Sequence, residues 1–113
     1  MTAQGKTVID RTMAFGRTQK GLANKVGGIV VVGGSLGLVD AVKDLCFYMM
    51  VPRMLPASFV AAYAAAKGDV KELPKCMQAA RSLGKQMVKV VEKKFKYPGD
   101  IEAPHFAFGT HTR

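Results

Sequence analysis

A glycine-rich segment, Gly-Gly-Ser-Leu-Gly at residues 33–37, has the composition best suited to binding a ligand. It follows four consecutive β-branched residues and precedes an apolar pattern with helical spacing. Where a strand leads into a helix, free backbone N–H groups favour anions, and glycine lets a planar group approach the backbone. Val32 occupies the first position of a dinucleotide fingerprint, and no phosphate-loop lysine follows. A tight strand-to-helix turn without a ligand explains the segment equally well.

Other side chains that could do chemistry are scattered. Cys46 and Cys76 lie outside any CxxC motif, and His105 and His111 belong to an aperiodic tail. We therefore expect no metal site and no iron–sulfur cluster from these cysteines. Both cysteines fall in apolar helical pattern, which predicts buried free thiols in a reducing cytoplasm. Ser35 has no histidine near it in the sequence and no G-x-S-x-G elbow around it, so nucleophilic catalysis is not indicated.

The positive charge is concentrated in one segment. The chain has 17 Lys and Arg against 8 Asp and Glu, a net charge of +9, and such a balance attracts anions. Residues 71–96 hold eight of the bases and only two acids, Glu72 and Glu92. We interpret this segment as a solvated helix face. Aromatic, Asn and Gln side chains are not interleaved among its bases in the way that base readout or stacking needs, so nucleic acid is not the expected partner.

Length and hydropathy exclude several classes of protein. The chain has 113 residues, of which 49% are hydrophobic and 22% charged, as expected for one globular domain. The longest apolar run, residues 27–34, is much shorter than the roughly 20 residues that cross a bilayer. Residues 1–12 are mixed and polar, without the apolar core of a signal peptide. We therefore expect no membrane association.

Periodicity predicts alternating helices and strands. The first helix should begin at its N-cap Thr2 and stop at Gly21. A strand buried on both faces should include residues 29–32. Ser35 is the expected N-cap of a second helix that ends at Pro52. Residues 54–63 are ambiguous between strand and helix, and a strand from Ser58 followed by a loop is favoured. An apolar stripe predicts a last helix over residues 73–95, with proline in its first turn.

These elements form an α/β sequence in the order helix, strand, helix, strand, helix. Two strands make a very narrow parallel sheet, and the apolar strand over residues 29–32 would lie at an edge unless another strand pairs with it. The pattern therefore indicates part of a larger sheet.

Four segments resemble one known family. Residues 1–12 (MTAQGKTVIDRT), residues 27–35 (GGIVVVGGS), residues 66–70 (AKGDV) and residues 79–85 (AARSLGK) occur in the order found in flavodoxin-like NADPH-dependent FMN reductases. The iron–sulfur flavoprotein branch is the most similar, and the resemblance covers residues 1 to about 95.

The resemblance implies a flavodoxin-like, doubly wound α/β fold. Residues 1–97 would be the C-terminal half of such a domain, and residues 98–113 an irregular tail. FMN is the implied cofactor. Thr2 and Ala3 correspond to one loop beside the flavin ring, and Gly33, Gly34, Ser35 and Gly37 correspond to a second. The phosphate loop and the cluster cysteines belong to the N-terminal half of the family fold, which has no counterpart here.

Two functional hypotheses follow. The first is an FMN-associated oxidoreductase or electron-transfer fragment in the cytoplasm, whose FMN site needs an N-terminal half or partner chain to complete it; a homo-oligomer is the other expected assembly. NAD(P)H or a redox protein would then be its partner, and whether the chain is itself an enzyme stays open. The alternative is a non-catalytic α/β module that binds no flavin and associates with itself through its unpaired strand edge.

Overall fold

The computed structural model describes residues 1–19 and 21–100, and it confirms the alternating α/β order. The elements are α1 (Ala3–Gln19), β1 (Val26–Gly33), α2 (Leu38–Met50), β2 (Leu55–Tyr63), the short 3-10 helix η1 (Asp69–Glu72) and α3 (Pro74–Glu92). The prediction of an irregular tail over residues 98–113 falls largely on positions 101–113, which lie outside the described residues.

The two strands form a parallel sheet. β1 pairs with β2 from Val26 opposite Leu55 to Gly33 opposite Tyr63. Ala57 has no partner residue in this register, so the ladder is irregular beside Pro56. Proline lacks a backbone N–H and is accommodated at such an irregularity, which explains how β2 begins at Leu55 rather than at the expected Ser58.

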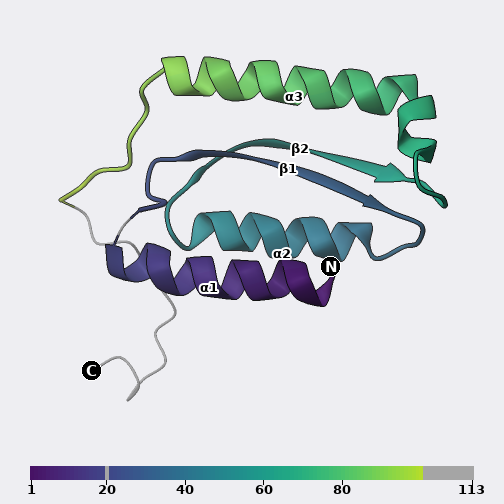
Figure 1. Cartoon of the computed structure of the whole chain (residues 1–113). Coiled ribbons are helices and arrows are strands. Elements are labelled where there is room, and N and C mark those ends of the chain that lie inside the picture. Colours follow the sequence, from purple (N-terminus) through teal and green to yellow (C-terminus); the bar gives the residue numbers. More distant parts are fainter. Residues whose placement is uncertain (20, 101–113) are drawn as a thin grey trace.

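Helices lie on both faces of the sheet without covering them fully. The prediction of a strand buried on both faces is wrong, because Val30 and Val32 of β1 are 58% and 48% exposed. α3 lies on one face, and α1 and α2 lie together on the other (Figure 1). A hydroxyl–hydroxyl bond of 2.9 Å between Thr12 and Tyr48 joins the third turn of α1 to the third turn of α2. The two helices run in the same direction, so their first turns lie at the same end of the molecule (Figure 1).

Among the residues whose burial the structure describes, the core is small and apolar. Its buried side chains come from both strands, α2 and α3, and are Ile29, Leu38, Ala41, Met49, Leu55, Ala62 and Leu83. A methyl group added at Gly27 would lie 2.6 Å from the Met49 sulfur, and one at Gly28 would lie 2.7 Å from the Met87 sulfur. Glycine is therefore needed at positions 27 and 28, near the start of β1, because methionines from α2 and α3 contact the strand on its two faces.

The helix boundaries follow local hydrogen bonding. Thr2 is the N-cap of α1, as predicted, because its hydroxyl accepts the Gly5 N–H at 3.1 Å. The prediction that Ser35 caps α2 is wrong: α2 begins at Leu38, and its N-cap is Gly37. The ladder continues to the Ala64 N–H, which donates to the Gly33 carbonyl at 3.1 Å, so residues 34–36 are needed to reverse the chain.

The last helix agrees with its predicted pattern, with Pro74 in the first turn and Leu83 buried.

The prediction of two buried thiols is wrong for Cys46, which is exposed on α2, whereas Cys76 is half-buried; both are free. Leu38, Ala41 and Met49 supply the buried side of α2, and Cys46 lies off that side. Across residues 1–19 and 21–100, no helix combines the length and apolar character needed to traverse a bilayer.

Candidate functional site

The glycine turn (residues 33–37) lies where the strands end. Gly33 is the last residue of β1 and pairs with Tyr63, the last residue of β2. A methyl group at Gly34 would lie 3.5 Å from the Ala64 carbonyl oxygen, so the turn also borders the loop that follows β2. In parallel α/β sheets, ligands bind at this carboxyl edge of the strands.

The glycine turn is open to solvent. Residues 34–37 are all exposed, and 87% of Leu36 is accessible. Within the described part of the chain, no hydrogen bond occupies the backbone N–H groups of these four residues. These N–H groups are unused donors on exposed residues.

Gly37 is not required by the fold. Its φ of −72° is available to any residue, and a methyl group there would meet no atom within 4 Å. Gly37 thus differs from Gly27 and Gly28, whose missing side chains make room for methionine. The space beside Gly37 is open to solvent and accessible to a ligand.

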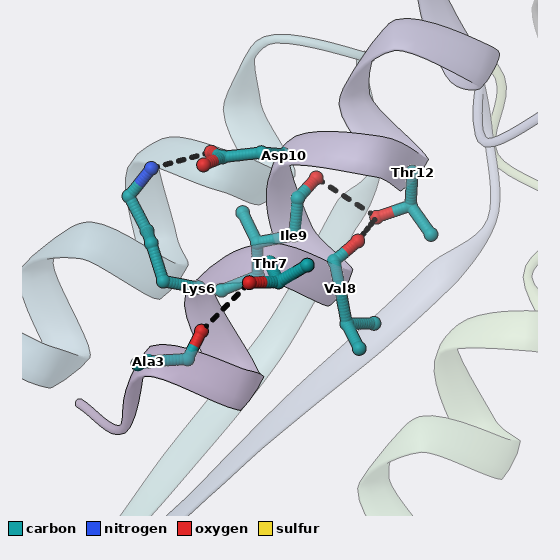
Figure 2. A network of polar contacts seen from close by, with 7 residues as sticks. All are labelled: Ala3, Lys6, Thr7, Val8, Ile9, Asp10 and Thr12. Atoms are coloured by element: carbon teal, nitrogen blue, oxygen red, sulfur yellow. Dashed lines mark hydrogen bonds and ion pairs between the residues drawn. The ribbon is translucent and has the colours of Figure 1, made fainter.

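The second group of predicted site residues lies at the same end of the molecule. Thr2 and Ala3 begin α1, and the N-terminus lies towards the end where the strands finish (Figure 1). Their polar atoms serve the helix: the Thr2 hydroxyl caps it, and the Ala3 carbonyl accepts the Thr7 hydroxyl at 3.0 Å (Figure 2). No hydrogen bond joins Thr2 or Ala3 to the glycine turn among the described residues.

The remaining polar groups of α1 also act locally. Lys6 forms an ion pair with Asp10, one turn away, and the Thr12 hydroxyl contacts the carbonyls of Val8 and Ile9 (Figure 2). Asp10 is therefore a helix-surface charge, as its sequence context indicates. The described part of α1 offers backbone and packing to the candidate site rather than a reactive side chain.

Sequence reasoning missed two neighbours of the glycine turn. Tyr63 stands opposite Gly33 at the end of β2 with 55% of its surface exposed. The loop after β2 is fixed by Asp69, whose carboxylate accepts the N–H groups of Ala65 and Ala66 at 3.2 and 2.7 Å. An aromatic residue closing a second parallel strand was the available signal, but it required the strand register to be known.

The chemistry available at this edge is hydrogen-bond donation by the backbone. Among the described residues, no group of three His, Cys, Asp or Glu side chains could hold a metal ion. His105 and His111 lie outside the described residues. Unused N–H donors next to the strand end that carries exposed Tyr63 are suited to an acceptor-rich planar molecule.

The basic segment forms a solvated helix face. Arg81, Lys85, Lys89 and Lys93 recur at four-residue spacing and are all exposed. Ion pairs found within the described part of the chain, Lys6 with Asp10 and Lys43 with Asp40, do not involve them. This placement agrees with the interpretation from sequence, and the partner of the segment stays a prediction.

Comparisons of this chain with protein-family models, with curated proteins and with solved structures find no match. The flavodoxin-like resemblance therefore depends on the quoted motifs, and the functional argument depends on the geometry of the glycine turn.

Proposed function

We propose that this chain provides the part of an FMN site that contacts the flavin ring, within a flavodoxin-like oxidoreductase or electron-transfer assembly. The observation that carries the proposal is the open glycine turn at the carboxyl edge of a parallel sheet, with four N–H groups lacking partners in the described part of the chain. Exposed Tyr63 beside Gly33 adds an aromatic surface of suitable type.

The residues of the turn fit one part of FMN. The nitrogen and carbonyl oxygen atoms along the flavin ring edge are hydrogen-bond acceptors, and the N–H groups of Gly34, Ser35 and Gly37 are donors. When bound, FMN would supply electron transfer, while these donors would hold the ring and tune its potential. The turn contains no lysine or arginine, so the phosphate would be held by another segment or chain.

The fold supports an additional strand on one particular edge. Crossover connections between parallel strands are right-handed. When two successive crossover helices lie on the same face, each new strand must therefore be added on the same side of the previous one. α1 and α2 share a face (Figure 1), and α2 connects β1 to β2. A parallel strand preceding α1 would therefore pair with β1 on the edge away from β2.

This position agrees with the strand order 2-1-3-4-5 of flavodoxin-like sheets. There the fourth and fifth strands are neighbours, the third pairs with the free edge of the fourth, and FMN binds between the first and third. β1 and β2 would be the fourth and fifth. The phosphate would then lie beyond the missing third strand. NAD(P)H or a redox protein is the electron partner that this assembly would need.

The cellular setting belongs to the same proposal. Cys46 and Cys76 are both free, and one of them is exposed. Exposed free thiols persist in the reducing cytoplasm, which is where we place the protein.

A second candidate function is supported by the free edge itself. Among the described residues β1 pairs with β2 alone, which leaves its other edge open, and an open apolar edge strand invites pairing with another strand. Val30 and Val32 are 58% and 48% exposed on one face of this strand. A second copy of the chain could occupy this edge without any flavin. The protein would then be an oligomer in solution, and Val30→Lys would convert it to a monomer while leaving its fold intact.

The experiment that separates the two functions is an equilibrium titration of the full chain with FMN and with riboflavin, which has the same ring but no phosphate. Because this chain addresses only the ring, we expect saturable binding of both, with dissociation constants near 1 mM and equal within about threefold. Gly34→Val, which places a branched side chain on the turn, should weaken both at least about tenfold. Gly84→Ala on α3 is the matched control.

The opposite results are equally clear. Binding of neither flavin by an oligomeric protein would reject the proposal in favour of the self-associating module. A strong preference for FMN over riboflavin would show that the phosphate, rather than the ring, is recognised here.

A further inference from the structure

A short segment after α3 folds back across the amino ends of the strands. Lys94 has a positive φ of 53°, which reverses the chain after the helix. The Tyr97 N–H then donates to the Asn24 side-chain oxygen at 2.8 Å, and the Arg53 guanidinium lies 5.1 Å from the centre of the Tyr97 ring. Arg53 also donates to the Pro98 carbonyl at 3.2 Å. We call residues 94–98 the strap.

The strap is anchored on two turns that are themselves joined. Asn24 precedes β1 and Arg53 precedes β2, and each has a left-handed backbone. The Asn24 N–H donates to the Arg53 carbonyl at 2.9 Å. Because both anchors are fixed to each other and to the strands, the strap has a defined position relative to the sheet.

A hollow of about 700 Å³ lies between the strap, the end of α3 and the first residues of the strands. Its apolar wall includes Val26 and Leu55 from the strands, Val90 from α3 and Phe95 from the strap. The Phe95 ring packs edge-on against Tyr97, with 5.8 Å between ring centres, yet 56% of Phe95 is exposed. An aromatic ring held in a fixed position and left open to water is a surface that an apolar ligand can cover.

The charged residues of the hollow all have one sign. Lys25, Lys94 and Lys96 line it, and its lining includes no aspartate or glutamate. None of these three lysines takes part in the ion pairs formed within the described residues. Three like charges around a low-dielectric wall attract an anion and disfavour a cation.

We propose that this hollow binds a free amphipathic anion, a molecule with an apolar body comparable to a medium-chain fatty acid and one carboxylate. The apolar body would cover Phe95, Val90 and Leu55, and the carboxylate would lie among the lysines. The hollow is at the amino ends of the strands, opposite the glycine turn, so this site is independent of the proposed flavin function.

The test is a titration of the full, isotopically labelled chain with decanoate below its micelle concentration, followed by backbone amide shifts. We expect saturable shifts at Val26, Leu55 and Phe95, without shifts in the glycine turn. Decanol, which has the same tail and no charge, should bind at least about tenfold more weakly. Equal binding of the two would remove the role of the lysines and overturn the proposal.

Paired variants locate the charge effect. Lys94→Asn together with Lys96→Gln removes two charges while asparagine keeps the left-handed backbone, and it should weaken decanoate binding at least about tenfold with decanol unchanged. The matched control, Lys85→Gln with Lys89→Gln, removes two charges from the outward side of α3 and should change binding by less than about twofold. Equal losses in both variants would indicate general attraction to a basic protein.

A lipid surface is the competing source of the same chemistry. Binding to vesicles that contain anionic lipid, combined with no saturable response to free decanoate, would also overturn the proposal, because it would assign the lysines to a membrane surface.

Discussion

The two ends of the β1–β2 sheet are built by opposite means. At the amino end, side chains fill the space around the strands: methionine sulfurs lie next to Gly27 and Gly28, and the strap positions an aromatic ring beside three lysines. At the carboxyl end, the backbone is accessible to solvent: residues 34–37 are exposed, and nothing lies within 4 Å of the space that a Gly37 side chain would fill. Glycine therefore has two different roles around a single strand.

The contrast shows which glycines belong to the fold. Gly27 and Gly28 are required by neighbours that are visible in the structure. Gly37 has ordinary backbone angles and open space around it, so no neighbouring atom requires glycine there, and its N-cap position accepts other residues as well as glycine. The central claim of the proposed function is that a planar ligand accounts for the open turn.

The largest expected effect concerns the packing on which both ends depend. Leu83 is buried between α3 and the sheet, and Leu83→Ala should lower the free energy of unfolding by about 2–4 kcal/mol. Leu36→Ala, the same substitution in the exposed turn, should change it by less than about 0.5 kcal/mol. Urea denaturation measures both. Similar losses for the two variants would mean that the turn is packed against something in the folded protein.

A smaller effect should separate the two kinds of glycine. The methyl group of Gly28→Ala would lie 2.7 Å from the Met87 sulfur and 3.3 Å from Leu83, so we expect a loss of about 1 kcal/mol in stability. Gly37→Ser adds a side chain in open space at an N-cap position, where serine is favoured, and should be neutral or slightly stabilising. Thermal unfolding measures the stability of both variants. A larger loss for Gly37→Ser than for Gly28→Ala would contradict the distinction between the two kinds of glycine.

The smallest expected effect sharpens the account of the amino end. Asn24→Gly keeps the left-handed backbone but removes the oxygen that accepts the Tyr97 N–H. We expect about 1 kcal/mol less stability and faster hydrogen exchange at the Tyr97 amide. Asn24→Asp, which retains an acceptor oxygen, is the control. Unchanged exchange in the glycine variant would show that this bond does not hold the strap.

Much of this fold could be predicted from local patterns. The β-branched run over residues 29–32, the Thr2 cap and the stripe that buries Leu83 each depend on neighbours a few residues away. The strand, the cap and the helix are confirmed, but burial of the strand on both faces is not. The start of α2 was mispredicted, since the ladder extends through Gly33 to Ala64. That extension depends on a strand thirty residues further along the chain.

The candidate site was harder to predict than the elements. The glycine turn could be found because its composition is local, but Tyr63 becomes its neighbour only through the strand register. The strap could not be predicted either, because Asn24, Arg53 and Tyr97 meet through tertiary folding. Residues that are far apart in sequence and lack periodicity leave no pattern to detect.

The most direct test of the central claim is a map of the backbone amide shifts caused by FMN in the labelled full chain. The account predicts that the largest shifts occur at Gly34, Ser35 and Gly37, with Tyr63 affected and residues 24–26 and 94–97 unchanged. Shifts confined to the strap and the lysines around it, with the glycine turn silent, would contradict the claim.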